Sequence, residues 1–453
     1  MSKINNIKWT FSNEENIKLL LEKRISISEL SEKYFGKDAV VAGYVKRIKD
    51  MGKNLKFLTL ADSSDEVQLT FKSDVYNETD CVDELTPQTF IVAKGEACKG
   101  RSKKGHEIVV KDFYLLGDIA QPIPTEAQTS LDKRLDYRWI DLREDKHRFP
   151  IVLLSEFARN ARDFFHKNGF TEIFTPKLIG TPTEGGSEVF TIPYFGKQAY
   201  LAQSPQFYKQ MAICSGLDKV FEIAPVFRAN PSFTKRHDTE FTSLDFETGY
   251  ISSHDDVMKT EEDMLNHIFS NVKEEWGEKI RKTYNKEVMI PGKIPKIKME
   301  EAYEIVKKEN ISEQGDLRPE GEKEISKHVK QNFSNDFAFI TDFPYQARPF
   351  YHMKGKPMSN GNETTRSFDL IYEGLEITTG AQREHRYQQL VKQAQEKGLG
   401  IDNLSYYLDF FKYGAPSHGG LGLSPTRVIM GLTDIKNVRE ATLVPRDPKR
   451  LFP

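Results

Sequence analysis

The chain has 453 residues, enough for roughly two or three domains, and 38% of them are hydrophobic and 29% charged. Its 65 Lys and Arg against 67 Asp and Glu exclude a globally basic nucleic-acid-binding protein. Three widely spaced cysteines without a CxxC pair argue against a disulfide framework or a thiolate zinc site. No apolar run approaches the ~18 residues of a membrane span, and the N-terminus lacks a signal core, so we expect a cytoplasmic protein.

The first third of the chain changes from helical to strand-like patterning. Residues 1–36 read as a helical extension, with Ile17 and Leu21 at near-helical spacing. Residues 37–118 hold short apolar strands separated by polar turns, a pattern that predicts an OB-type β-barrel. Its cationic loops and aromatic strand residue suit single-stranded nucleic acid, although a solvated basic face is the alternative. Residues 119–148 are interpreted as a linker or hinge.

The remaining part, residues 149–453, mixes helices and strands. Apolar residues at helical spacing predict an amphipathic helix over about 150–168, followed by a strand that ends at Pro176. A charged stretch with a helical period, about 253–336, is interpreted as a helical insertion. The pattern therefore predicts a second, larger domain of mixed type.

Charged residues interrupt two alternating apolar runs that flank the polar loop 231–238. The runs predict an antiparallel hairpin, with Glu222 and Arg228 on one strand and Asp245 and Glu247 on the other. Ions buried in a sheet without partners are costly, so these charges indicate either a site or a solvated face with salt bridges.

A second predicted hairpin turns at Glu373-Gly374. It pairs Asp369 with Thr378 and places Glu376 diagonally across from Asp369 on the same face. Two neighbouring carboxylates repel each other unless a cation lies between them, so the pair favours a hard divalent metal, with coincidence as the alternative.

Three further stretches suit a ligand site. The Gly185-Gly186 loop reads as a lid or a plain turn, and Gln206 and Lys209 share one face of a predicted helix. The run from His418 to Arg427 is rich in glycine and opens a helix that carries an arginine. Two fixed guanidiniums together with a divalent ion are what a nucleoside triphosphate needs.

Four segments carry a resemblance to a known family: residues 135–143, 203–210, the hairpin at 220–247, and 437–450. Together they resemble a class II aminoacyl-tRNA synthetase, specifically an aspartyl-tRNA synthetase of the archaeal/eukaryotic-like type. The resemblance runs from about residue 36 to the end of the chain.

The resemblance implies an α+β fold, with an N-terminal OB-fold anticodon-binding barrel followed by a class II antiparallel-sheet catalytic domain. It implies that ATP and Mg²⁺ are used to activate L-aspartate to aspartyl-adenylate, which is transferred to the 3′ end of tRNA(Asp). Transfer to tRNA(Asn) as well is an open alternative. Residues 151–176 would form a homodimer interface.

The resemblance also implies roles for individual residues. Arg228 would hold the α-phosphate and Arg427 the γ-phosphate, as the catalytic arginines. The remaining sets are Arg228, Asn230, Arg236, His237, Glu376 and Arg427 for ATP; Glu184, Gln206, Lys209, Asp245, Thr379 and Arg383 for aspartate; Asp369 and Glu376 for the metal; and Lys49, Phe57, Gln68 and Glu107 for the tRNA anticodon.

Two positions depart from the family pattern. Asn230 stands where the family usually has an adenine-recognising Glu, and Ser424-Pro-Thr-Arg427 replaces Gly-x-Glu-Arg. Asn can still accept a hydrogen bond from the adenine amino group. The alternatives are an asparaginyl enzyme, against which Lys209 argues, and a synthetase paralogue with a non-charging role.

Overall fold

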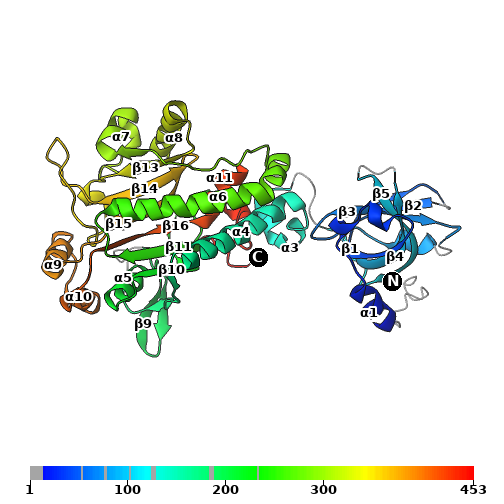
Figure 1. Ribbon diagram of the computed structural model, residues 1–453. Helices are drawn as coiled ribbons and strands as arrows, with labels where there is room; N and C mark the ends of the chain where they lie inside the picture. The colour runs from blue at the N-terminus through cyan, green and yellow to red at the C-terminus, as the bar shows by residue number, and fades with distance from the viewer. Residues whose placement is uncertain are drawn as a thin grey trace. The chain divides into compact units, whose positions relative to one another are not determined.

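The structure is a computed structural model that describes residues 14–52, 55–75, 79–100, 104–123, 129–182, 188–231 and 234–452. The chain divides into two compact units, residues 1–145 and 146–453, and each is treated by itself (Figure 1). Among the described residues, no helix combines the length and the apolar character needed to cross a membrane.

The first unit contains a closed five-stranded barrel, which confirms the predicted OB-type fold. Its strands are β1 (Asp38–Asp50), β2 (Leu55–Ala61), β3 (Glu66–Lys72), β4 (Phe90–Lys99) and β5 (His106–Leu115), in the order β1-β2-β3-β5-β4. Side chains alternate along each strand, so Leu58 and Leu60 fill the interior while Phe57 lies on the outside. The helix α1 (Glu14–Glu22) and the 3₁₀ turns η2 (Ile27–Glu29), η3 (Glu32–Tyr34) and η4 (Thr79–Glu84) complete this part.

The expected linker at 119–148 is partly helical. It contains α2 (Leu131–Asp136) and α3 (Arg138–Asp141). The hydroxyl of Tyr44 in β1 donates to the carbonyl of Arg143 at 2.5 Å, and the Arg143 guanidinium lies 4.9 Å from the Phe90 ring centroid. These contacts hold the end of the linker against the barrel wall.

The second unit is built on an eight-stranded sheet with the order β12-β13-β14-β15-β16-β11-β10-β6. All neighbouring strands are antiparallel except the two outer pairs, β12–β13 and β10–β6. The strands are β6 (Thr171–Glu172), β10 (Lys219–Phe227), β11 (Glu240–Gly249), β12 (Lys296–Lys298), β13 (Phe337–Thr341), β14 (Ser367–Tyr372), β15 (Leu375–Gln382) and β16 (His418–Leu423). A small second sheet joins β7 (Leu178–Ile179), β9 (Lys197–Leu201) and β8 (Thr191–Tyr194).

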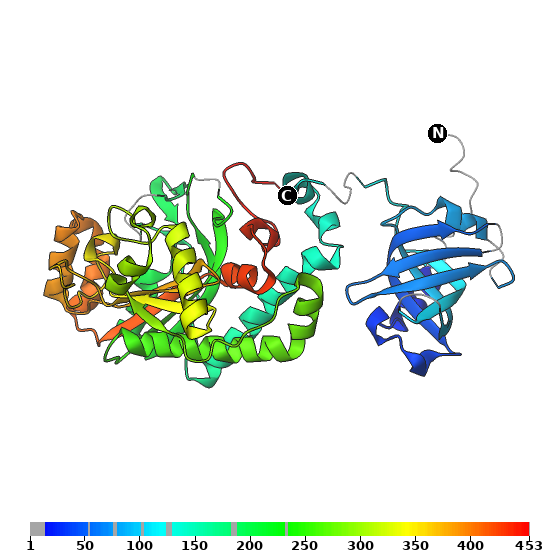
Figure 2. The same cartoon turned by 90° about the horizontal axis from the view of Figure 1, so that it is seen from above.

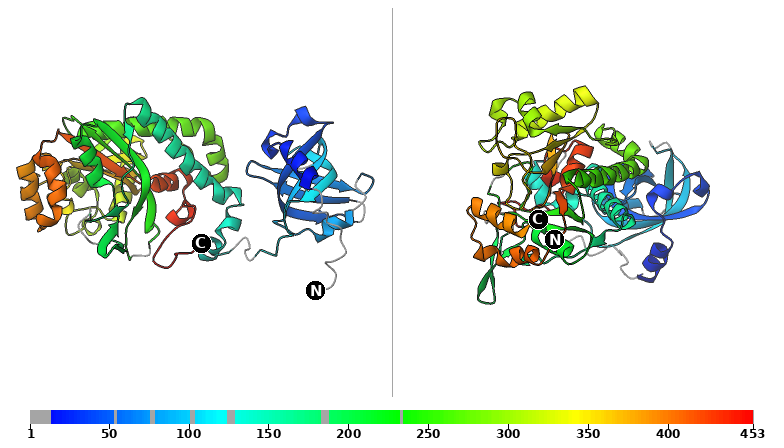
Figure 3. Two further views of the ribbon diagram at one scale, coloured as in Figure 1. Left: turned by 90° about the horizontal axis from the view of Figure 1, so that it is seen from below. Right: turned by 60° about the vertical axis from the view of Figure 1, so that its left-hand side comes forward.

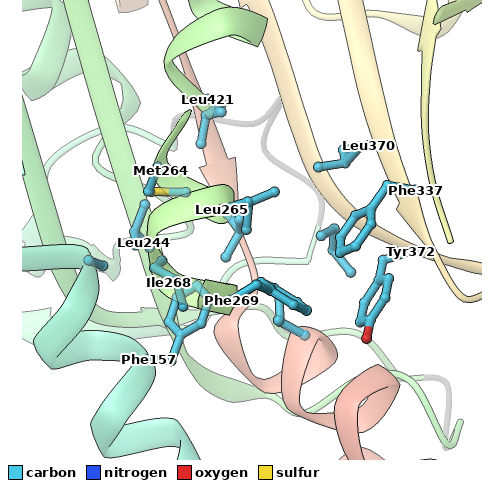
Figure 4. Packing of buried hydrophobic residues seen from close by; sticks show 14 of the residues in the cluster. Phe157, Leu244, Met264, Leu265, Ile268, Phe269, Phe337, Leu370, Tyr372 and Leu421 are labelled. Atoms are coloured by element: carbon cyan, nitrogen blue, oxygen red, sulfur yellow. The ribbon is translucent and has the colours of Figure 1, made fainter. Parts of the chain in front are cut away.

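Two long helices, α4 (Asp145–Lys167) and α6 (His254–Tyr284), lie side by side across the sheet (Figures 1 and 2). Asn271 of α6 donates to Asn160 of α4 at 2.7 Å. Phe157 of α4 and Phe269 of α6 are fully buried in one core with the sheet, to which α11 (Pro425–Thr433) also contributes (Figure 4). The other helices are α5 (Gln206–Cys214), α7 (Met299–Ile305), α8 (Pro319–Phe333), α9 (Tyr387–Glu396) and α10 (Ser405–Lys412); α9 and α10 pack together at one end of the unit (Figure 3).

Much of the stretch 253–336, interpreted from the sequence as a helical insertion, packs with the rest of the second unit. The inner stripe of α6, including Leu265 and Ile268, packs on the central sheet, and β12 is an edge strand of that sheet. The helices α7 and α8 form a smaller core together with β12, β13 and β14, which includes Met299, Ile325 and Ile340. A long helix on a domain surface is amphipathic, so the many charged residues on the outer face of α6 obscured the apolar stripe that it buries.

The β14–β15 hairpin contains a β-bulge that the sequence did not reveal. Tyr372 pairs with Leu375 as predicted, but Asp369 pairs with Thr379 and not with Thr378, since the register shifts after Leu370. Glu376 and Thr379 are three residues apart and would face opposite sides of a regular strand. The extra residue brings both onto the same cavity.

Candidate active site

A cavity of about 360 Å³ opens on the face of the sheet opposite α6. Thr378 points toward α6, where its hydroxyl donates to Glu261 at 2.5 Å, whereas the next residue, Thr379, lines the cavity. All six residues predicted for ATP line this cavity: Arg228, Asn230, Arg236, His237, Glu376 and Arg427. The structure therefore brings together residues that are up to about 200 positions apart in the chain.

The two arginines predicted to be catalytic come from different elements. Arg228 follows β10, and its guanidinium lies 5.6 Å from the ring centroid of Phe241 on β11. Arg427 lies in the first turn of α11, where Ser424 is the N-cap and Pro425 the first helical residue. Ser and Pro are favoured at these two positions, so this departure from the family motif preserves the helix start.

Arg427 and Arg236 are held by glutamates. Nη1 of Arg427 donates to the Glu376 carbonyl at 2.7 Å and lies 3.9 Å from the Glu376 carboxylate. Arg236 pairs with Glu322 of α8, and that same carboxylate accepts the backbone N–H of Glu376 at 2.9 Å. The arrangement fixes two cations at the cavity wall before any ligand is present.

The predicted carboxylate pair has a partner that the sequence reasoning missed. Arg348 lines the cavity, and its Nη2 lies 2.5 Å from Asp369 Oδ2. Burial raises the pKa of Asp369 to about 7, with Arg348 opposing and Glu376 reinforcing the shift. Glu376 lines the cavity, and Asp369 lies just behind it, 7% exposed.

The donor chemistry of this pair fits a divalent ion. Asp369 Oδ1 is buried without a hydrogen-bond partner, and Glu376 adds a second hard oxygen donor. The described part of the chain has no group of three or more His, Cys, Asp or Glu side chains able to hold a metal. Water or substrate oxygens would therefore have to complete the coordination.

Of the residues predicted for aspartate, Gln206, Asp245, Thr379 and Arg383 line the cavity, and Glu184 lies outside the described residues. Lys209 is absent from the lining. Its ammonium lies 2.9 Å from Asp245 Oδ1 and donates to the Leu421 carbonyl at 2.7 Å. The ammonium also lies 3.5 Å from Glu247 Oε2, so Lys209 is held among groups of β11 and β16.

Glycines in β16 make room for the buried carboxylates. A Cβ on Gly420 would lie 2.3 Å from Glu247 Oε2, and one on Gly422 would lie 3.2 Å from Asp245 Oδ1. The sequence had suggested close approach of this backbone to a ligand. The structure shows that the close approach at Gly420 is to strand β11.

Two of the charged residues in the β10–β11 hairpin, Glu222 and Glu247, have different partners. Glu222 accepts from the Thr175 backbone N–H and hydroxyl, both at 2.8 Å, and pairs with Lys177. Glu247 is fully buried and pairs with Arg383 at 2.9 Å. Glu222 thus anchors the chain after β6, while Glu247 lies behind the cavity wall and holds Arg383, which lines it.

The four residues predicted on the barrel share one outer face. Lys49 pairs with Phe57 across β1 and β2, and Gln68 pairs with Glu107 across β3 and β5. Phe57 is opposite Thr70, two residues from Gln68 on the same side of β3. Gln68 donates to Glu107 at 2.6 Å.

Comparison with known proteins defines the class of protein first. Residues 130–448 match the family "tRNA synthetases class II (D, K and N)", and residues 39–116 match "OB-fold nucleic acid binding domain". The first match spans more than half of the chain. The protein belongs to the class II tRNA synthetases of the D, K and N family.

Individual relatives and a solved structure resemble the chain over nearly its whole length. The chain is 40% identical to the aspartate–tRNA(Asp/Asn) ligase of Aeropyrum pernix, covering 91% of this chain and 95% of that one. It is 41% identical to the aspartate–tRNA(Asp) ligase of Pyrococcus abyssi, covering 94% and 98%. Among solved structures, the asparaginyl-tRNA synthetase of Pyrococcus horikoshii with asparaginyl-adenylate superimposes with a TM-score of 0.86 at 28% identity, covering 95% and 99%.

Proposed function

We propose that the protein is an aspartate–tRNA ligase that activates L-aspartate with ATP and transfers it to tRNA(Asp). The observation that carries the proposal is a single cavity with Arg228 and Arg427 at one part and the buried cation Arg383 at another. The first two suit a triphosphate and the third a side-chain carboxylate. Relatives that are about 40% identical over nearly the whole chain bear aspartate–tRNA ligase names.

In the first step, the aspartate α-carboxylate attacks the α-phosphorus of ATP in line and displaces pyrophosphate. Arg228 neutralises charge on the α-phosphate, and Arg427, held by Glu376, neutralises the γ-phosphate. Arg383 binds the substrate's side-chain carboxylate, while Lys209 and Asp245 shape the pocket. These groups act by positioning and charge neutralisation, without a covalent protein intermediate.

Glu376 and Asp369 would hold Mg²⁺, which supplies charge neutralisation and orientation of the phosphate oxygens when bound. Arg348 already offsets part of the negative charge of this pair. In the second step, the terminal ribose hydroxyl of tRNA attacks the activated carbonyl and releases AMP.

The outer barrel face formed by Lys49, Phe57, Gln68 and Glu107 would read the unpaired anticodon bases. A half-exposed aromatic ring beside polar side chains suits base stacking combined with edge recognition. Stacking of one base is worth roughly 1–3 kcal/mol. We therefore expect Phe57→Ala to raise the KM for tRNA by about 10- to 100-fold while aspartate-dependent pyrophosphate exchange stays at the wild-type rate. An unchanged KM for tRNA would contradict the placement of the anticodon on this face.

We also propose that the protein is a homodimer. Three large apolar side chains within residues 171–195 are highly exposed, Phe174 (86%), Leu178 (50%) and Phe195 (93%), as is Tyr250 (71%) directly after β11. Large apolar side chains exposed in this way indicate an interface, and a second copy of the chain is the occupant expected for the family.

We expect Phe174→Asp to shift the sedimentation coefficient from that of a dimer to that of a monomer, because a charge would be buried at the interface. Tyr413→Asp is the control, since Tyr413 is 84% exposed directly after α10, far from this segment in sequence. A wild-type protein that sediments as a monomer at micromolar concentration would contradict the homodimer.

Aspartate charging of two purified tRNAs, with anticodons GUC and GUU, tests the proposed function. Charging of the GUC tRNA is expected. Charging of both would identify an enzyme that serves tRNA(Asp) and tRNA(Asn), a property named for the Aeropyrum pernix relative. Charging with asparagine in place of aspartate would replace the proposal with the asparaginyl alternative, to which the fold similarity also corresponds.

A further inference from the structure

His352 lies beside Arg383 because the two residues face each other across an isolated antiparallel bridge. The backbone hydrogen bonds on either side of the pair are Met353 N–H to the Gln382 carbonyl, 3.0 Å, and Glu384 N–H to the Tyr351 carbonyl, 2.9 Å. His352 and Arg383 are therefore a non-hydrogen-bonded pair, the kind whose side chains approach most closely. Both line the cavity, and each is 2% exposed.

The hydrogen bond between them fixes the state of the imidazole. Nη1 of Arg383 lies 3.1 Å from Nε2 of His352. A guanidinium can only donate, so Nε2 must be the acceptor and the ring proton must lie on Nδ1. Burial, followed by the charges of Arg383 and Arg348, holds the pKa of His352 well below its ordinary value, which agrees with a neutral ring.

Counting donors shows what His352 does to Arg383. A guanidinium has five N–H groups. Nε donates to Glu247 Oε1 at 2.9 Å, and Nη2 donates to Glu247 Oε2 at 3.3 Å and to the Gly420 carbonyl at 2.9 Å. His352 accepts a fourth, so one N–H of Nη1 is left without a protein acceptor among the described residues.

We propose that His352 is a positioning residue for recognition of the substrate's side-chain carboxylate. By accepting one Nη1 hydrogen of Arg383, it leaves the other to bind the carboxylate in a fixed direction. The inference rests on the proposed function and extends it to a residue outside the sets that the sequence assigned. Gln393 of α9 supports the arrangement, because its side-chain amide donates to the His352 carbonyl at 2.9 Å.

A matched pair of variants tests this role. A glutamine amide reaches the place of Nε2, whereas an asparagine amide reaches only that of Nδ1. We therefore expect His352→Gln to keep the acceptor for Arg383 and His352→Asn to lose it. The measurement is aspartate-dependent pyrophosphate exchange, with KM for aspartate, KM for ATP and kcat determined separately, together with the melting temperature of each variant.

The expected result is a KM for aspartate raised about tenfold or more in His352→Asn, since a buried donor of Arg383 then lacks its partner, and within about threefold of wild type in His352→Gln. The KM for ATP stays unchanged in both. His352→Leu fills the space without providing an acceptor, so it should behave like His352→Asn. It takes the place of His352→Asn in the comparison if that variant does not fold.

Equal aspartate KM values in the Gln variant and in a folded variant without the acceptor would overturn the proposal, even if both melt at lower temperature. So would a rise in the KM for ATP that matches the rise for aspartate, which would indicate general distortion of the cavity. A wild-type protein that shows no aspartate-dependent exchange would instead refute the proposed function itself.

Discussion

Replacing Arg228 by alanine should lower aspartate-dependent pyrophosphate exchange by about 10³-fold. The guanidinium lies against Phe241 at the end of β10, so under the proposed function it would supply preorganised charge at the α-phosphate. The loss should fall mainly on kcat, because charge on the phosphate increases in the transition state.

Two controls accompany this measurement. Arg281→Ala removes an arginine that is 57% exposed on α6 and should leave exchange at the wild-type rate. Arg228→Lys keeps a positive charge but loses the planar donor fork of the guanidinium. Its exchange rate should lie between that of Arg228→Ala and that of the wild type. Wild-type exchange in Arg228→Ala would show that the triphosphate is bound elsewhere.

Glu261→Gln should make the protein more stable at alkaline pH than the wild type. Glu261 of α6 is fully buried beneath the active-site strands, and its Oε2 has no hydrogen-bond partner. Burial raises its pKa to about 8, opposed by the Thr378 hydroxyl and reinforced by Asp369. A buried carboxyl of this kind folds in its protonated form.

The sign of the effect follows from linkage. Because the folded-state pKa lies above the ordinary value of 4.5, the unfolded chain releases this proton first as pH rises. The stabilisation is complete below about pH 4.5 and is lost progressively up to about pH 8. Glutamine cannot ionise, so the difference in unfolding free energy between variant and wild type should grow by about 1.4 kcal/mol per pH unit across this range.

Urea unfolding in metal-free buffer at several pH values measures this slope. Glu274→Gln is the matched control, because Glu274 lies on the same helix and is exposed to solvent. That variant should follow the wild type at every pH. A constant offset between Glu261→Gln and wild type would mean that Glu261 is already ionised in the folded protein.

The sequence by itself determined the barrel, the opening hairpin and the set of residues around the cavity. Local signals carried the first two: strands of period two with polar turns for the barrel, and charges placed where apolar residues were expected, such as Arg228 and Asp245, for the hairpin. The full set of residues around the cavity came from the resemblance to the class II synthetases. The predicted aspartate and anticodon roles remain predictions, although the residues of each described set lie close together. Glu184 lies outside the described residues.

The register of the β14–β15 hairpin and the partners of the buried charges were decided by the tertiary structure alone, because the contacts that set them join distant parts of the chain. The bulge that turns Glu376 toward Thr379 leaves no mark in the hairpin sequence. No sequence signal singled out Arg348 or His352, which the fold brings to Asp369 and Arg383. Long-range pairing, with its burial of charge, sets the state of these groups, and no local pattern encodes it.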